Sequence, residues 1–168
     1  MIDTRRLHIR PLSYDELRTY SLSPADLAAE LGLTISRSLI DEETKQAIET
    51  DLLPKLTDPE NDPLFYTMWI LIEKECHAII GGLCFHGGPD ATRSVEVGYG
   101  IDDAYCRNGY ATEALGGLID WLKADKRVDS LLAETERTND ASIKVLTKNG
   151  FVCADRGDTL LFRLDVAN

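Results

Sequence analysis

A change of hydrophobic period between residues 94 and 123 restricts the fold more than any other feature of the sequence. Over Ser94–Ile101, apolar or aromatic residues alternate with Glu96 and two glycines, which is the two-residue period of a β-strand. From Ala111 to about Lys123, the apolar residues instead recur every three or four positions, as on one face of an amphipathic helix. A strand that leads into such a helix predicts a strand–helix unit packed on a β-sheet.

The other expected elements extend this sheet. Apolar runs with a two-residue period predict strands, and apolar residues at helical spacing behind capping residues predict helices. The further strands are expected at Arg6–Arg10, Leu64–Ile72, Ala78–Phe85, Ser130–Glu136 and Asp158–Asp165, and the further helices within residues 13–57 and at Asn139–Asn149. With two late strand–helix–strand crossovers, this order predicts an α/β (α+β) fold with one mixed sheet and helices on both faces.

Composition and charge exclude several classes of protein. No repeat, low-complexity segment or long linker divides the 168 residues, so we expect one domain over residues 1–168. The net charge of −11 repels phosphate backbones and argues against nucleic acid as a partner. The sequence has neither an apolar run of about 18 residues nor a signal-peptide pattern, so we expect a cytoplasmic protein with no membrane partner.

The cysteines predict neither a metal site nor a disulfide framework. Cys76, Cys84, Cys106 and Cys153 contain no CxxC pair, and no histidine stands at ligand spacing from them. We therefore expect four free thiols and no metal.

The strand at Ser94–Ile101 has a bare face. Glu96 is followed on that face by Gly98 and Gly100, so an extended ligand can lie flat against the backbone there. A bulge or the close packing of another strand explains the same two glycines equally well.

The segment between this strand and the amphipathic helix has the composition of an anion site. Gly109 and Ala111 are small, Arg107 is cationic, and the amides at a helix start are free to bind an anion such as a pyrophosphate. An ordinary turn, with Gly109 supplying a positive φ, is the alternative. Together the two features predict a site for a long thin ligand with phosphates at one end, and no GxGxxG or GxxxxGK[ST] motif competes with it.

At this point the sequence resembles the Gcn5-related N-acetyltransferases. The motifs that carry the resemblance are Glu96-Val97-Gly98-Tyr99, Arg107-Asn108-Gly109-Tyr110-Ala111-Thr112-Glu113-Ala114, Asn139-Asp140-Ala141-Ser142 and Lys148-Asn149-Gly150-Phe151. The opening Thr4-Arg5-Arg6-Leu7-His8-Ile9-Arg10-Pro11-Leu12 is similar to the branch that acetylates the N-termini of ribosomal proteins. The resemblance implies that family's fold, with a mostly antiparallel sheet of about six to seven strands.

The resemblance also implies acetyl-CoA as the acetyl donor. Its pantetheine arm would lie along Tyr99–Ile101 and its pyrophosphate on the amides of Arg107–Thr112. The implied binding residues are Tyr99, Gly100, Ile101, Cys106, Arg107, Asn108, Gly109, Tyr110, Ala111, Thr112 and Asn139.

The sequence departs from the family pattern at two positions. Cys106 stands where the glycine-rich signature begins with Gln or Arg, and we expect it to be the most reactive of the thiols without taking part in catalysis. Leu146 stands where many members have a tyrosine that protonates the leaving thiolate. In the ribosomal-protein branch the proposed substitute is a serine three residues after the asparagine, which is Ser142 here.

Acetyl transfer needs a neutral amine, a stabilised oxyanion and a proton for the sulfur. We expect a backbone N–H near Tyr99 or Gly100 to hold the carbonyl oxygen. Glu96 and Ser142 are the catalytic candidates, as base and as proton donor, with His86 or water as other bases and water as another donor. The structural alternatives are a strand acid for Glu96 and a first-turn serine for Ser142.

The acceptor amine is less constrained. An α-amine with a pKa near 8 costs roughly 1 kcal/mol to neutralise at pH 7, whereas lysine costs roughly 4.6 kcal/mol. A site with one modest base therefore favours a protein N-terminal α-amine, and the acidic segment Asp41–Glu60 attracts cationic acceptors. The alternatives are a polyamine, an amino acid or an aminoglycoside as acceptor, or a silent acyl-CoA-binding module. The sequence leaves open whether the protein is a monomer or a homodimer.

Overall fold

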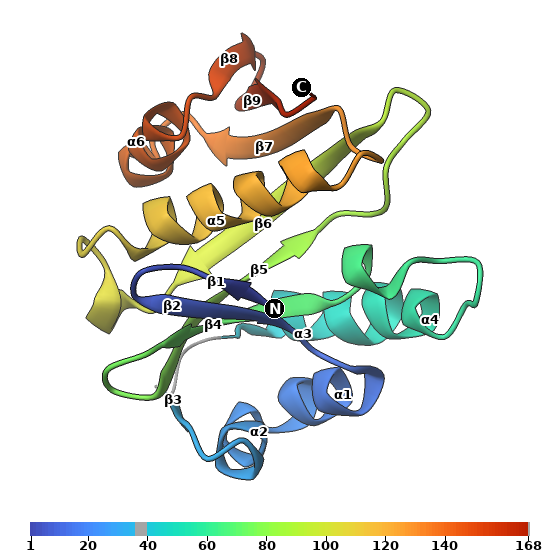
Figure 1. Cartoon of the computed structure of the whole chain (residues 1–168), viewed down its shortest axis with the longest axis vertical. Coiled ribbons are helices and arrows are strands. Elements are labelled where there is room, and N and C mark those ends of the chain that lie inside the picture. Colours follow the sequence, from blue (N-terminus) through green and yellow to red (C-terminus); the bar gives the residue numbers. More distant parts are fainter. Residues whose placement is uncertain (36–39, 168) are drawn as a thin grey trace.

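The computed structural model describes residues 1–35 and 40–167, and in this part of the chain nine strands form one sheet (Figure 1). The strand order is β1-β2-β4-β5-β6-β7-β9-β8, with β3 paired in parallel to β5. The strands are β1 (Ile2–Asp3), β2 (Leu7–Pro11), β3 (Thr34–Ile35), β4 (Met68–Glu73), β5 (Ala78–Phe85), β6 (Ser94–Ile101), β7 (Ser130–Glu136), β8 (Val152–Asp155) and β9 (Thr159–Asp165). All pairs except β3–β5 and β6–β7 are antiparallel, which confirms the expected fold class.

The helices begin at the polar residues that the sequence provides as caps. Ser13 and Glu16 form a capping box, and Ser23, Asp41 and Asn139 each accept an amide hydrogen bond at a helix start. The α-helices are α1 (Tyr14–Leu22), α2 (Pro24–Glu30), α3 (Glu42–Ala47), α4 (Leu53–Leu56), α5 (Tyr110–Ala124) and α6 (Asp140–Lys148). A π-helical segment, Ile48–Leu52, joins α3 to α4. Of the expected helical region 13–57, residues 36–39 lie outside the described residues.

The sheet has a hydrophobic core on each face. Successive side chains of β4 belong to different cores. Trp69 and Leu71 pack beneath α5, whereas Ile70 packs against the helices α1–α4. In Figure 1, α5 crosses one face of the sheet and α1–α4 gather at its lower edge and behind it. Helices thus cover both faces, as the sequence predicts.

Three expectations about the strands were wrong in part. The predicted strand Leu64–Ile72 begins only at Met68, because Pro63–Phe65 forms a 3-10 helix whose first turn is capped by Asp62. The sheet has nine strands where six to seven were expected. The difference comes from the short strands β1, β3 and β8, which the sequence pattern did not reveal. The third error concerns the end of the second crossover: α6 leads into β8, which runs in the same direction as β7, and the predicted strand β9 then turns back to lie between them, antiparallel to both.

Candidate active site

A wedge opens between the two central strands β6 and β7. Within the described residues, these strands pair only from Ser94↔Ser130 to Glu96↔Leu132. Beyond that point β6 stays paired with β5 as far as Ile101, and β7 stays paired with β9 as far as Glu136. The two strands therefore diverge towards their carboxyl ends, the end of the sheet at which α5 begins (Figure 1).

The backbone of β6 presents amides to this wedge. The His86 N–H donates to the Glu96 carbonyl at 2.9 Å, and the Asp102 N–H donates to the Ile80 carbonyl at 2.8 Å. In an antiparallel pair, residues that hydrogen-bond to the neighbouring strand alternate with residues that turn their backbone groups away from it. The even-numbered residues of β6 therefore direct their backbone N–H and C=O groups towards β5, whereas Tyr99 directs its backbone N–H towards β7. Two amides were expected near the acetyl oxygen. The Tyr99 N–H is free to donate to it, whereas the Gly100 N–H is directed at β5, where Gly100 pairs with Gly82.

At the open end of the wedge, α5 begins without a side-chain cap. Its cap residue is Gly109, with φ at +80°, and no side chain accepts its first amides. The amides of Tyr110, Ala111 and Thr112 thus remain available to an anion, at the positive end of a helix of 15 residues. The helices α1, α2, α3 and α6 all have side-chain caps. The expected cradle is therefore compatible with a phosphate group.

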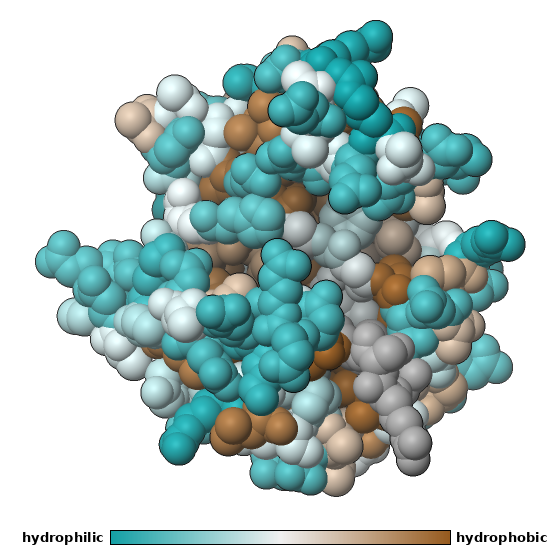
Figure 2. Space-filling view, turned by 180° about the vertical axis from the view of Figure 1, so that it is seen from behind, coloured by the Kyte–Doolittle hydropathy of each residue, from teal (hydrophilic) through white to brown (hydrophobic). Residues whose placement is uncertain are grey.

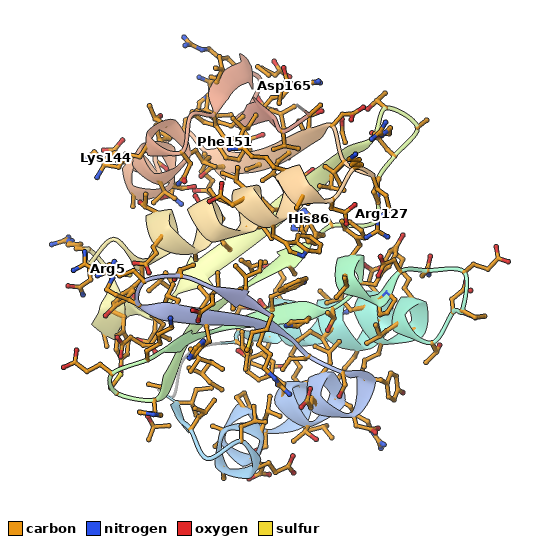
Figure 3. The ribbon with its side chains drawn as sticks, in the orientation of Figure 1. Arg5, His86, Arg127, Lys144, Phe151 and Asp165 are labelled. Atoms are coloured by element: carbon orange, nitrogen blue, oxygen red, sulfur yellow. The ribbon has the colours of Figure 1, made fainter. Side chains whose placement is uncertain are left out.

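The loop before α5 has a defined shape. Arg107 has a φ of +64°, which is uncommon for a residue other than glycine, so two left-handed residues flank Asn108. The Asn108 side chain donates to the carbonyl oxygens of Tyr105 and Cys106, at 3.2 and 3.1 Å. Cys106 is exposed, with its Sγ 3.6 Å from the Ile101 carbonyl. Figure 3 shows that Arg5 and Lys144 also lie at this end of the molecule.

The N-terminal segment fixes the start of α5. The backbone N–H and Nε of Arg6 donate to the Glu113 carboxylate at 2.6 and 2.7 Å, and the Thr4 hydroxyl donates to it at 2.7 Å. Arg6 also donates to the Asn108 carbonyl and lies 4.3 Å above the Tyr110 ring. Burial raises the pKa of Glu113, but these hydrogen bonds lower it more. No spacing in the sequence joins residues 6 and 113, so this contact could not be predicted.

On the α5–α6 side of the wedge, two hydroxyl groups meet. The Tyr99 hydroxyl lies 3.0 Å from that of Ser142, in a contact that joins β6 to the first turn of α6. Burial raises the pKa of Tyr99, so its phenol stays protonated at neutral pH. Asn139 caps α6 by accepting the Ser142 N–H at 3.0 Å. Leu146 is completely buried one helical turn further on and offers no proton donor.

The other catalytic candidates lie on the opposite face of the sheet. Glu96 alternates with Tyr99 along β6, and its Oε1 lies 3.0 Å from Nδ1 of His86. The structure thus brings the two candidate bases together on one face of the sheet. Ser142, which contacts Tyr99, lies on the other face. Sequence reasoning named Glu96 and His86 as alternatives and missed that they form one pair.

The two glycines of β6 differ in their surroundings. A Cβ at Gly100 would meet nothing within 4 Å, because this position opens into a cavity of about 380 Å³. A Cβ at Gly98 would lie only 2.9 Å from Nε2 of His86. The predicted bare face is thus open at Gly100 and covered by an imidazole ring at Gly98. The cavity is also lined by Tyr20 of α1 and Thr44 of α3. In Figure 2, apolar residues show in recesses between hydrophilic side chains on the rear face.

Other predicted features concern metals, membranes and thiols. In the described residues, no group of three or more His, Cys, Asp or Glu side chains is arranged to hold a metal ion. No helix in the same ranges is both long and apolar enough to cross a membrane. All four cysteines are free.

Comparisons with known proteins agree with this geometry. Residues 6–152 match the family model described as an acetyltransferase (GNAT) domain. The uncharacterized N-acetyltransferase YjdG of Bacillus subtilis is 28% identical over 154 residues, which cover 90% of this chain and 89% of that protein. The resemblance drawn from the sequence motifs is therefore confirmed at the level of the family.

Solved structures show the same fold. The ribosomal-protein-S5-alanine acetyltransferase of Vibrio fischeri superposes with a TM-score of 0.68 at 20% identity, covering 97% of this chain and 94% of that one. RimL, a ribosomal L7/L12 alpha-N-protein acetyltransferase solved in complex with coenzyme A, gives 0.66 at 15% identity, with 96% and 95% covered. Together with the family match, these observations show that the chain belongs to the GNAT acetyltransferase family and is an N-acetyltransferase.

Proposed function

We propose that this protein transfers the acetyl group of acetyl-CoA to the α-amine of a protein N-terminus. The observation that carries the donor assignment is the wedge between β6 and β7, which ends at the uncapped start of α5. The free amides of Tyr110, Ala111 and Thr112 would bind the pyrophosphate, and the pantetheine arm would lie in the wedge beside Tyr99. The thioester of the bound donor supplies the acetyl group.

Residues on both sides of the wedge serve the reaction. The Tyr99 N–H donates to the acetyl oxygen and stabilises the negative charge that develops on it. The hydroxyl pair of Ser142 and Tyr99 delivers a proton to the departing sulfur. The pair of Glu96 and His86 receives the proton of the attacking amine from the opposite face. This division lets the donor and the acceptor approach from different sides.

The surroundings of the acceptor favour an α-amine. The cavity at Gly100 has a volume of about 380 Å³, and Asp102 and Asp103 contribute to its lining, so it can attract a cation. Neutralising an α-amine at pH 7 costs roughly 1 kcal/mol, which one base can supply, against roughly 4.6 kcal/mol for lysine. The names of the structural neighbours, an S5-alanine and an L7/L12 acetyltransferase, point to the same class of acceptor.

A thiol-release assay with matched acceptors tests the proposal. We expect turnover with peptides that begin with a free Ser or Ala, and a loss of more than tenfold in kcat/KM when the α-amine is blocked and one lysine is left free. A preference for polyamines, amino acids or aminoglycosides over these peptides would overturn the acceptor assignment. Tight CoA binding without turnover on any amine would instead indicate a silent binding module.

A further inference from the structure

The contact between His86 and Glu96 assigns different roles to the two residues. We propose that Nε2 of His86 receives the proton of the acceptor amine and that Glu96 is a positioning residue that orients the imidazole. This inference rests on the proposed acetyl transfer, and it names the base that the transfer requires.

The hydrogen bond determines the tautomer of His86. An ionised carboxylate can only accept hydrogen bonds, so Nδ1 must carry the hydrogen that joins the ring to Glu96 Oε1, at 3.0 Å. The neutral ring therefore has its lone pair on Nε2, which is free to take a proton. Conversely, one oxygen of Glu96 is already used by the ring, which makes this carboxylate less available to the amine.

The position of the ring agrees with this role. Nε2 lies 2.9 Å from the point where a Cβ of Gly98 would be, so the imidazole covers the backbone of β6 one residue before Tyr99. Gly98, which the ring covers, is itself one of the residues that line the cavity at Gly100. The His86 side chain is 53% exposed and that of Glu96 is 32% exposed, which leaves the ring the more accessible of the two. A glycine at position 98 gives the ring the space it needs.

Few titratable groups face this ring in the described parts of β5 and β6. Glu96 on β6 is its ion-pair partner. Cys84, two residues earlier on the same face of β5, is a neutral thiol because burial raises its pKa to about 11. Glu96 therefore supplies the negative charge that stabilises the imidazolium when the ring takes a proton.

The step balances without another reactant. The amine nitrogen bonds to the acetyl carbon and the bond from that carbon to sulfur breaks. The nitrogen's proton goes to Nε2 of His86, and the electron pair leaves with the sulfur of CoA. That thiolate takes a proton from the pair of Ser142 and Tyr99, and both sites return to their starting state by exchange with water.

Variants of the pair separate the two roles. We expect His86→Gln to lower kcat/KM for a Ser-initiated peptide by about 10²–10⁴-fold, as for a positioned base. Glu96→Gln should lower it by only about 10–100-fold, as for a group that orients another. Glu96→Asp, which keeps a carboxylate on β6, should retain more of the rate than Glu96→Gln. Added imidazole should restore part of the activity of His86→Ala.

A substitution at Gly98 provides a second test. In Gly98→Ala the new methyl group would displace the ring and lower the rate, and the loss should vanish in the background of His86→Ala. The matched control is His8→Gln, which removes another histidine that pairs with a carboxylate, Asp3, at 2.6 Å on the edge strands. Calorimetry should show unchanged CoA affinity in every variant.

The inference is overturned if His86→Gln keeps the wild-type rate, or if Glu96→Gln loses more activity than His86→Gln. It also fails if Gly98→Ala lowers the rate equally with and without His86. These outcomes differ from the failure of the proposed function, in which the wild-type protein binds CoA but releases no thiol with any amine.

Discussion

The two faces of the sheet are built differently, and the difference matches the two substrates of the proposed reaction. Beneath α5 and α6 lies the larger core, with 24 buried hydrophobic residues among those described, against 10 on the face of α1–α4. The larger core holds the fixed start of α5, the contact of Tyr99 with Ser142 and the aromatic packing of Trp69 on Trp121. The smaller core borders the cavity at Gly100. In the proposed reaction, the more extensively packed face would serve the donor and the face with the cavity would serve the acceptor.

The largest expected effect concerns the donor side. Gly109→Val should abolish CoA binding, because a β-branched residue at φ +80° is strained and shifts the amides of the cradle. Isothermal titration calorimetry measures this loss.

Gly32→Val is the matched control. It places the same strain at φ +68° in the other region, where a Cβ meets nothing within 4 Å. We expect a loss of stability with unchanged CoA affinity. Undiminished affinity in Gly109→Val would contradict the cradle.

The next effect concerns proton delivery to sulfur. Ser142→Ala should lower turnover by about 10²–10⁴-fold at all pH values and leave CoA affinity nearly unchanged. Thr147→Ala, later on α6, is the control, since its hydroxyl donates to the Ile143 carbonyl away from Tyr99. A Ser142→Ala enzyme with wild-type turnover would make Ser142 a first-turn residue only and water the donor.

A smaller effect concerns the N-terminal contact with α5. The pKa of Glu113 is lowered on folding, so its contribution to stability is complete well above its ordinary value of 4.5 and is lost as the pH falls through the folded value. Glu113→Gln should therefore cost about 1–3 kcal/mol at pH 7, and the difference from wild type should shrink as the pH falls below 4.5. Urea unfolding at several pH values measures this, and a constant difference would contradict the assignment.

The smallest effect is expected at Cys106. Cys106→Ser should keep acetyl transfer, because the thiol lies beside the cradle without a part in the reaction. Cys106 should also label faster with iodoacetamide than Cys76, the other exposed thiol, since the hydrogen bond with Glu73 raises the pKa of Cys76. Trapping an acetyl group on Cys106 would contradict this.

The sequence predicts the central elements well because strong local signals define them. The period change at residues 94–123 and the Gly150 signal after α6 need no tertiary contact, and Gly150 ends that helix with φ at +84° while the Phe151 N–H bonds to the Leu146 carbonyl. The short strands β1, β3 and β8 depend on pairing partners, so propensity alone could not reveal them.

The candidate site divides in the same way. Its residues were found by motif, but their relations depend on how distant segments pack. The contacts of Glu113 with Arg6, of Tyr99 with Ser142, and of Glu96 with His86 join residues 10 to 107 positions apart. Strand alternation alone predicts that the side chains of Glu96 and Tyr99 lie on opposite faces of the sheet. This pattern could have been used to predict that the proposed donor and acceptor sites lie on different faces.

Hydrogen exchange with and without CoA tests most directly the claim that the wedge and the start of α5 form the donor site. We predict slower exchange for the amides of Tyr110, Ala111 and Thr112 and for that of Tyr99, with little change in α1–α3. Protection confined to α1–α3, with none at the start of α5, would contradict the account.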